Sequence, residues 1–249
     1  NIKKIVMLTG DKRKVGENVA KKLGIELEEL DGWTCCGASH VQDIAPEITL
    51  ATNARNIALA EEKGLNLLTV CNTCTLMLRE AKNELDANEK EKNEVNKKLA
   101  QIGKQYRGTT DITHFLWVLI RDYGLDKLKA KVVKPLTGLR VAEYYGCHIL
   151  RPQTELGFED YQMPTSLADL ISAIGATPID FSHKLDCCGF HAVYPAHDSV
   201  MQMTGSINKD AATEGADCVV TPCPLCQMQL DMFQKEAKEV VGGGKDMPI

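Results

Sequence analysis

The feature that most constrains this chain is a pattern of cysteines that occurs twice. Two adjacent cysteines, Cys35 and Cys36, are followed 36 residues later by a Cys-x-x-Cys pair that begins at Cys71. The second half repeats this arrangement with the same 36-residue interval. The eight cysteines of the pattern are Cys35, Cys36, Cys71, Cys74, Cys187, Cys188, Cys223 and Cys226. An equal interval in both halves is typical of a duplicated structural unit.

The sequence around each pattern alternates between extended and helical segments. Each half opens on an apolar stretch, "KKIVMLTG" or "LRVAEYYG", and continues as helix, strand, Cys-Cys, helix, strand, Cys-x-x-Cys and helix. This alternation predicts parallel sheets covered by helices. Ligand sites in such folds form at the carboxyl ends of strands, so both cysteine groups of one half are expected at one site.

We therefore expect an α/β protein with two pseudo-repeated Rossmann-like domains, each carrying a Cys-Cys-Gly and a Cys-x-x-Cys group. The first repeat is expected at 1–80, a helical connector at 81–136 and the second repeat at 137–249. The stretch 81–108 is highly charged and its apolar residues are sparse, which predicts a helical hairpin solvated on one face.

Composition narrows the class of protein. The 249 residues are 44% hydrophobic and 25% charged, which is ordinary for a globular protein. The net charge of −5, without any basic and aromatic stretch, argues against nucleic-acid binding. No apolar run is long enough to span a bilayer, and the N-terminal one is too short for a signal peptide. We expect a cytoplasmic chain whose ten cysteines are metal or redox ligands rather than disulfides.

The doublets indicate a particular kind of metal site. Thiolates are soft ligands that suit zinc or iron–sulfur clusters. Adjacent cysteines pair poorly with each other, and their side chains point apart in extended backbone. They therefore suit a cluster of several irons better than one ion, although four thiolates also close a tetrahedral zinc site. The second half offers a fifth thiolate, Cys147, after its first strand, whereas Cys218 lies in a strand and is expected in the core.

The twofold arrangement, together with "YYGCHILRP", "PTSLADLISAIGA", "CCGFHA" and "TPCPLC", resembles the cysteine-rich CCG domain family. The likeness is greatest to the catalytic B subunit of heterodisulfide reductase and covers nearly the whole chain. It implies a non-cubane [4Fe–4S] cluster in each half. The residues that match the ligand positions of the second cluster are Cys147, Cys187, Cys188, Cys223 and Cys226. Those that match four positions of the first are Cys35, Cys36, Cys71 and Cys74.

The resemblance also implies an activity and partners. The family's oxidoreductases reductively cleave, or form, a disulfide such as that of coenzymes M and B in methanogenesis. Their electrons come from a ferredoxin-like C subunit and a flavin-containing A subunit, without a membrane span in the B subunit. One alternative is a bacterial sulfur-oxidising subunit that acts on persulfides. Another is a non-catalytic electron-transfer or zinc subunit of a succinate- or glycolate-oxidoreductase complex.

The first half departs from the family pattern. Alignment of Gly10 with Gly146 puts Asp11 where Cys147 stands, and no cysteine precedes Cys35. The first half is then expected to hold a four-cysteine cluster, a zinc ion or nothing, or else to lack a loop that carries the missing ligand. The sequence also ends early relative to the family, which slightly favours the missing loop.

Two histidines and two glycines complete the candidate sites. His148 and His191 are expected beside the second site, where a histidine could donate a proton to a departing thiolate. A hydrogen bond to sulfur or to the backbone is the competing interpretation. Gly37 and Gly189 follow the doublets and are expected to have positive φ or to allow close backbone approach.

Overall fold

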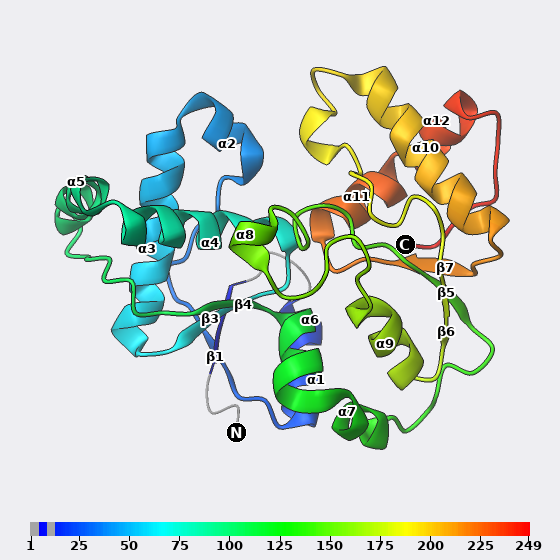
Figure 1. The fold of residues 1–249 in the computed structure, drawn as a ribbon, viewed down its shortest axis with the longest axis horizontal. Helices are drawn as coiled ribbons and strands as arrows, with labels where there is room; N and C mark the ends of the chain where they lie inside the picture. Colours follow the sequence, from blue (N-terminus) through cyan, green and yellow to red (C-terminus); the bar gives the residue numbers. More distant parts are fainter. Residues whose placement is uncertain (1–4, 9–12) are drawn as a thin grey trace. The chain divides into compact units, whose positions relative to one another are not determined.

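The computed structural model describes residues 5–8 and 13–249 and divides the chain into two compact units (Figure 1). The first unit comprises Asn1–Val118 with Thr154–Leu156. The second comprises Leu119–Gln153 with Gly157–Ile249. In the described residues, no helix is both long and apolar enough to cross a membrane.

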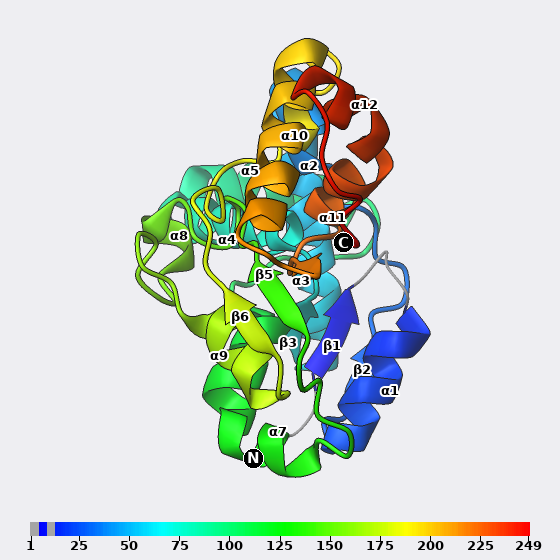
Figure 2. The ribbon, with the colours of Figure 1, turned by 90° about the vertical axis from the view of Figure 1, so that its right-hand side faces the viewer.

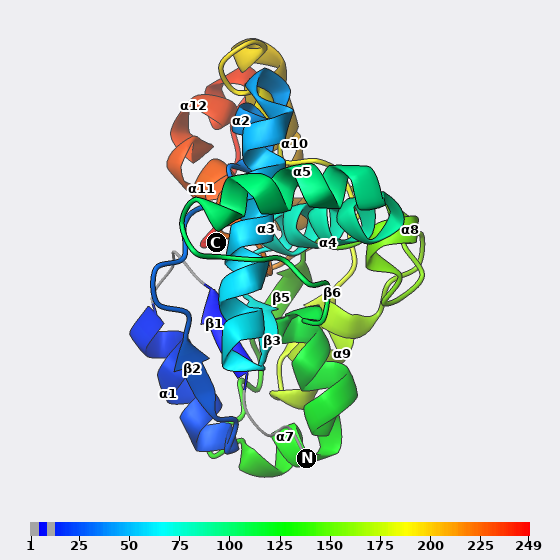
Figure 3. The same cartoon turned by 90° about the vertical axis from the view of Figure 1, so that its left-hand side faces the viewer.

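The first unit is built on a parallel four-stranded sheet with the order β2-β1-β3-β4. Its strands are β1 Ile5–Leu8, β2 Leu27–Glu29, β3 Asn66–Thr69 and β4 Ile112–His114. Its helices are α1 Arg13–Leu23, α2 Ala38–Ile44, α3 Pro46–Lys63, α4 Asn72–Ala87, α5 Glu89–Ala100 and the short α6 Phe115–Trp117. Figure 3 shows α3 running along the strands, with α2 at the end of α3 that points away from them. The core lies between α3 and the sheet, where Leu67 and Leu68 of β3 are fully buried.

Local sequence explains the ends of these helices. Helix α3 begins at Pro46, where the missing N–H is tolerated because the first N–H groups of a helix have no partner within it. Its C-cap is Gly64, which has a φ of 64°. Asn88 caps α5 by accepting a hydrogen bond from the Glu91 N–H. Acidic residues in the first turn of α5 and lysines in its last turn complement the helix dipole.

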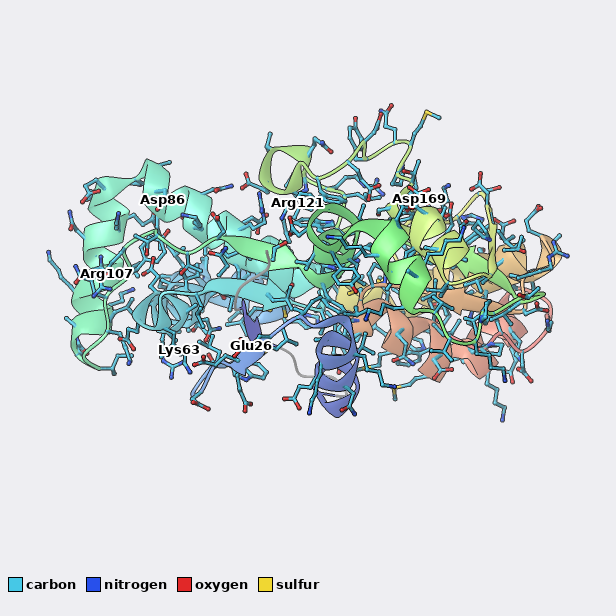
Figure 4. All side chains as sticks on the ribbon, turned by 90° about the horizontal axis from the view of Figure 1, so that it is seen from below. Glu26, Lys63, Asp86, Arg107, Arg121 and Asp169 are labelled. Atoms are coloured by element: carbon cyan, nitrogen blue, oxygen red, sulfur yellow. The ribbon has the colours of Figure 1, made fainter. Side chains whose placement is uncertain are left out.

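The expected helical hairpin is present as α4 and α5, and it is solvated on one face. Leu85, Val95 and Leu99 are buried in the core of the first unit. The Tyr106 hydroxyl donates to Asp86 at 2.8 Å, which ties the segment after α5 to the end of α4 where the two helices are joined. Figure 4 shows Asp86 at this end of the first unit. This hydrophobic face packs on the first unit, so residues expected in a connector belong to that unit up to position 118.

The second unit has a parallel three-stranded sheet with the order β6-β5-β7 (Figure 2). Its strands are β5 Arg140–Glu143, β6 Thr177–Ile179 and β7 Cys218–Val220. Its helices are α7 Leu125–Lys131, α9 Ser166–Ala173, α10 His197–Thr213, α11 Pro224–Met232 and α12 Gln234–Val240. A π-helical segment, Val118–Gly124, precedes α7, and the one-turn α8 Gln153–Leu156 follows β5.

Strand register shows that the two units repeat one plan. Ile5 of β1 pairs with Asn66 of β3, and Val141 of β5 pairs with Cys218 of β7. Asn66 and Cys218 each lie five residues before a Cys-x-x-Cys group. The α/β fold with parallel sheets and two repeats is therefore confirmed. The same register puts Asp11 opposite Cys147 in sequence, but Asp11 lies outside the described residues.

Candidate metal centres

Each Cys-x-x-Cys group lies where a strand turns into a helix. Cys71 is the N-cap of α4 and Cys223 is the N-cap of α11, both with extended backbone. Cys74 and Cys226 follow in the first turn of the same helices. A helix N-terminus presents N–H groups and the positive end of the helix dipole, which favours the thiolate form of cysteine.

In the second unit five thiols form a continuous series of contacts, which we call the second thiol set. In order of contact its members are Cys147, Cys187, Cys188, Cys226 and Cys223. Each member is hydrogen-bonded through its side chain to the next. The last three are buried, and the first two are half-buried. The structure thus brings together all five residues that the sequence proposed as ligands; their role as ligands stays a prediction.

The first unit has the same arrangement with four members, which we call the first thiol set. In order of contact they are Cys35, Cys36, Cys74 and Cys71. The Sγ atoms of Cys36 and Cys74 are 3.5 Å apart. Cys36 is buried, whereas Cys35 is exposed. The fifth position falls on Asp11, outside the described residues, so the structure leaves that prediction open.

The hydrogen bonds within the second thiol set give its members different pKa values. Cys147 and Cys188 donate hydrogen bonds to the Cys187 sulfur and lower the pKa of Cys187 to about 2. The Gly189 N–H also donates to this sulfur, at 3.3 Å. The hydrogen bond to Cys187 in turn raises the pKa of Cys188 to about 12, and a similar bond together with burial raises the pKa of Cys147. These hydrogen bonds therefore favour the thiolate form of Cys187 over that of its two neighbours.

Glycines let the backbone approach both sets closely. Gly37 and Gly189, which follow the two doublets, have φ values of 88° and 85°. Their predicted positive φ is confirmed, and glycine adopts this conformation at least cost. Gly146 has a φ of 69°, and a Cβ at this position would lie 3.0 Å from the Cys226 Sγ. The second thiol set is thus packed against backbone that leaves no room for a side chain.

Buried polar residues support the second thiol set in ways that the sequence analysis missed. The buried Tyr144 hydroxyl donates to the Asp186 carbonyl at 2.6 Å, which ties the end of β5 to the residue before the doublet. Burial, followed by the nearby thiols, raises the pKa of Tyr144. Lys184 pairs with the buried Glu143 at 2.7 Å, and its carbonyl accepts from the Tyr145 N–H at 3.0 Å. The aromatic pair directly before Gly146 and Cys147 was the available signal.

Two asparagines of α3 hold the first doublet, and these too were missed. Asn56 accepts from the Thr34 N–H at 3.0 Å and donates to the Thr34 carbonyl at 2.8 Å. Asn53 donates to the Cys36 carbonyl at 3.0 Å. Both asparagines are fully buried. Together with Thr49 they form a polar stripe at helical spacing on an otherwise apolar helix face, which is the signal that sequence reasoning could have used.

The two predicted histidines lie next to each other. The rings of His148 and His191 stack with their centroids 5.1 Å apart. His148 is close enough to Cys187 for its charge to lower the pKa of that thiol further. Their position beside the second thiol set agrees with expectation, whereas proton donation by either stays a prediction.

The ligand atoms determine which metal ion or cluster each thiol set could hold. Both sets consist of sulfur alone, and sulfur ligands select soft metals such as those of iron–sulfur and zinc sites. In the described part of the chain, no three His, Cys, Asp or Glu side chains are arranged around one metal-ion position. A mononuclear zinc site needs four ligands, whereas the second set has five in a row. Five thiols in series, with a glycine backbone against them, fit a group larger than one ion.

Comparison with known proteins agrees with this architecture. Residues 7–79 and 141–231 match the family CCG, described as a cysteine-rich domain. The chain is 49% identical to the 8-methylmenaquinol:fumarate reductase membrane anchor subunit of Wolinella succinogenes, over 96% of this chain and 83% of that protein. It is 33% identical to the B subunit of a CoB–CoM heterodisulfide reductase of Methanosarcina acetivorans, over 92% of this chain and 77% of that protein. A protein of Archaeoglobus profundus that is described as like the heterodisulfide reductase B subunit is 37% identical, over 87% and 74% of the two chains.

A solved structure has the same fold. A hypothetical protein from Helicobacter pylori superposes with a TM-score of 0.73 at 15% identity, covering 99% of this chain and 46% of that one. At this identity the likeness concerns the fold alone. Because the cysteine-rich family matches both repeats and the B subunits match most of the chain, this protein belongs to the CCG cysteine-rich domain family that includes the B subunits of heterodisulfide reductases.

Proposed function

We propose that the chain is an iron–sulfur electron-transfer subunit of a quinol-linked fumarate reductase or succinate dehydrogenase complex. The observation that carries this proposal is the 49% identity, over 96% of the chain, to the Wolinella fumarate reductase subunit. Identity to the heterodisulfide reductase subunits is lower, at 33% and 37%. The relatives therefore favour the electron-transfer alternative over disulfide reduction as the leading function.

The second thiol set would hold the cluster through Cys147, Cys187, Cys188, Cys223 and Cys226. A cluster bound there supplies one-electron transfer at a potential set by hydrogen bonds to its sulfurs and by solvent exposure. The protein provides both controls. The Gly189 N–H donates to the Cys187 sulfur at 3.3 Å, and three of the five cysteines are buried. Tyr144 excludes water on the β5 side because it is fully buried next to the thiols.

The first thiol set would hold either a smaller cluster or a zinc ion, and for zinc its four thiols would have to close around one position that no three described ligand side chains now surround. Its four thiols are enough to close a tetrahedral zinc site. The Asn53 and Asn56 hydrogen bonds fix the backbone of the doublet, which suits a structural centre. The exposure of Cys35 suits a metal site near the surface of the first unit.

Disulfide or persulfide reduction is the second candidate function. The stacked His148 and His191 favour it, because they place a potential proton donor beside Cys187. Cleavage of a disulfide needs two electrons and releases two thiolates, which protons from this pair would neutralise. In that case a ferredoxin-like subunit and a flavin-containing subunit would be the partners.

Metal analysis of anaerobically purified protein tests the assignment. We expect about four irons with matching acid-labile sulfide in the second unit. Cys187→Ser should lose them, whereas Cys218→Ser, a change outside both thiol sets, should keep them. A wild-type protein with zinc in both sets and no iron would contradict both candidate functions.

Electron paramagnetic resonance of the intact complex separates the two candidates. The electron-transfer proposal predicts that a menaquinol reduces the cluster and that fumarate re-oxidises it through the flavin-bearing subunit. The second candidate instead predicts a new signal when the coenzyme M–coenzyme B heterodisulfide or a persulfide is added, with no response to quinol. That second result would overturn the electron-transfer proposal.

A further inference from the structure

The first unit contains a cleft that neither thiol set uses. It lies between α2, α3, α4 and α5 and has a volume of about 220 Å³. Leu50 and Met77 form part of an apolar wall, and four glutamates also line it. No lysine, arginine or histidine of the described chain lines this cleft. A space of this size suits one side chain or a small molecule.

Two residues that line the cleft each carry a buried oxygen atom without a hydrogen-bond partner in the described part of the chain. The two atoms are the Asn53 Oδ1 and the Thr49 Oγ1, whose residues are 0% and 3% exposed. The Asn53 Nδ2 donates to the carbonyls of Cys36 and Thr49, so the amide oxygen is the free end of this side chain. A buried acceptor left unpaired is destabilising, because it has lost its bonds to water and gained none in return. A ligand that brings N–H or O–H donors into the cleft would pair these oxygens once the two side chains turn towards it.

The glutamates call for a positive charge. Burial raises the pKa of Glu80, and the charges of Glu155 and Glu84 raise it further. Burial also raises the pKa of Glu84, with Glu91 adding to the effect. Carboxylates that repel one another in a half-buried cleft are stabilised by a cation between them. The acidic lining and the unpaired acceptors thus point to the same ligand chemistry.

The cation that fits is organic rather than a metal ion. No three acidic, histidine or cysteine side chains among the described residues are arranged to coordinate one ion. A guanidinium group offers five N–H donors in a plane, enough for an amide oxygen, a hydroxyl and a carboxylate together. Its aliphatic stem would lie along Leu50 and Met77, as arginine stems do on apolar surfaces.

An exposed apolar patch beside the cleft indicates that a protein supplies this group. Val41, Ile44 and Ile48 are 39%, 86% and 56% exposed. Pro46 and Glu47, which lie between the two isoleucines in sequence, line the cleft itself. Apolar patches rimmed by polar residues mark protein or membrane contacts, and arginine is enriched at the centres of protein interfaces. The glutamates would repel an anionic lipid surface.

We propose that the cleft receives an arginine side chain of a partner protein whose apolar surface covers Val41, Ile44 and Ile48. This docking site goes beyond the electron-transfer role and does not depend on either thiol set holding a metal. The Asn53 side chain bridges the cleft and the first thiol set, because it also holds the Cys36 carbonyl. A partner docked here therefore sits one side chain away from the first doublet.

Calorimetry with two peptides tests the cationic pocket on the full chain. The probe is Ac-Leu-Arg-Leu-Leu-NH2, and its control replaces arginine by citrulline, which is similar in shape but neutral. We expect the arginine peptide to bind at least about tenfold more tightly at low salt, which corresponds to about 1.4 kcal/mol. Glu80→Gln should remove most of this preference, whereas Glu94→Gln, the same charge change on the exposed part of α5, should leave it. Equal binding of both peptides would overturn the proposal.

Two further measurements distinguish a partner protein from a small-molecule ligand and from a membrane surface. Ile44→Ser should weaken the arginine peptide several-fold but leave the binding of ethylguanidine unchanged. Ethylguanidine that binds as tightly as the peptide, with no effect of Ile44→Ser, would make this a small-molecule site and overturn docking. Ile44-dependent binding to phosphatidylcholine vesicles, without any peptide binding, would assign the patch to a membrane and overturn it as well. A thermal midpoint that is not lowered in any of these variants shows that the fold is intact.

Discussion

Gly146 offers a direct test of how closely the backbone packs against the second thiol set. It joins β5 to Cys147 and has a φ of 69°, and a Cβ added to it would lie only 3.0 Å from the Cys226 Sγ. Its matched control is Gly138, two residues before β5, with a φ of 87° and no described atom within 4 Å of its Cβ position. Alanine at Gly138 therefore tests the backbone alone, and alanine at Gly146 adds the contact with sulfur.

The expected loss of stability has two parts, the strained backbone conformation and the contact with the Cys226 sulfur. A non-glycine residue in the left-handed region costs about 1–2 kcal/mol, and this cost applies to both variants. Nonbonded atoms of this kind prefer about 3.5–4.0 Å, so the Cys226 sulfur would have to move by about 0.5 Å. Cys226 is 4% exposed, so this movement meets packed neighbours and adds about 1–3 kcal/mol for overpacking. Gly146→Ala should therefore destabilise the protein by about 2–5 kcal/mol in total.

The assay measures thermal unfolding and metal content of the anaerobic protein together. A loss of 1 kcal/mol lowers the midpoint by about 2–4 °C in a chain of this size, so Gly138→Ala should lower it by a few degrees. Gly146→Ala should lower it more and should also lose iron and sulfide, because the Cys226 sulfur is displaced. Full metal content in Gly146→Ala, or an equal metal loss in Gly138→Ala, would refute the close approach as a requirement of the site.

Three other changes test separate parts of the structure. Gly205→Ala in α10 would bring a Cβ within 2.6 Å of the Ala237 carbonyl in α12. Urea unfolding should therefore show a loss of stability of about 1–3 kcal/mol from overpacking, partly offset by about 1 kcal/mol from the higher helix propensity of alanine. A more stable variant would show that α10 and α12 separate easily. Asn56→Ala removes the two hydrogen bonds that its fully buried amide makes to the backbone of the exposed Thr34, so it should cost about 1–2 kcal/mol and reduce the metal content of the first thiol set alone. A matching loss in the second set would contradict a local role. The pKa of Glu80 is raised in the folded state, so its ionisation opposes folding as the pH rises above its ordinary value of 4.5. Glu80→Gln should accordingly raise the thermal midpoint at pH 8 and leave it nearly unchanged at pH 4, and a constant difference between the two pH values would rule out this carboxyl as the cause.

The sequence predicted the repeat and the thiol groups because both depend on local order along the chain. The 36-residue interval between Cys35 and Cys71 recurs in the second half, and strand–helix alternation places each group at a strand end. The contact order within a set could not be predicted, because it depends on how the doublet loop packs on the helix that carries the Cys-x-x-Cys group. Sequence spacing fixes which cysteines share an edge of the sheet, but not which sulfur touches which.

The supporting residues were missed for a related reason. Asn53, Asn56 and Tyr144 act through hydrogen bonds to backbone far away in sequence, and the local signals, a polar stripe on α3 and an aromatic pair before Gly146, do not identify those partners. The first compact unit extends past residue 80, where the first repeat was expected to end, to Val118. The sparse apolar residues of the hairpin, such as Leu85 and Leu99, predicted a hairpin solvated on one face, and these residues are fully or almost fully buried against the first unit.

The comparison of the two units suggests how one fold provides two kinds of site. In both units the doublet and the Cys-x-x-Cys group meet in the same contact order, so the strand–helix frame alone supplies four thiols. The fifth thiol, Cys147, comes from the loop after the first strand of the second unit, and it is hydrogen-bonded to Cys187 of the doublet. Loops at strand ends change more readily than the frame that carries them. In the proposed ligand sets, the residue at this one loop position would decide whether a repeat offers four sulfur ligands or five, and with that which metal group the repeat could hold.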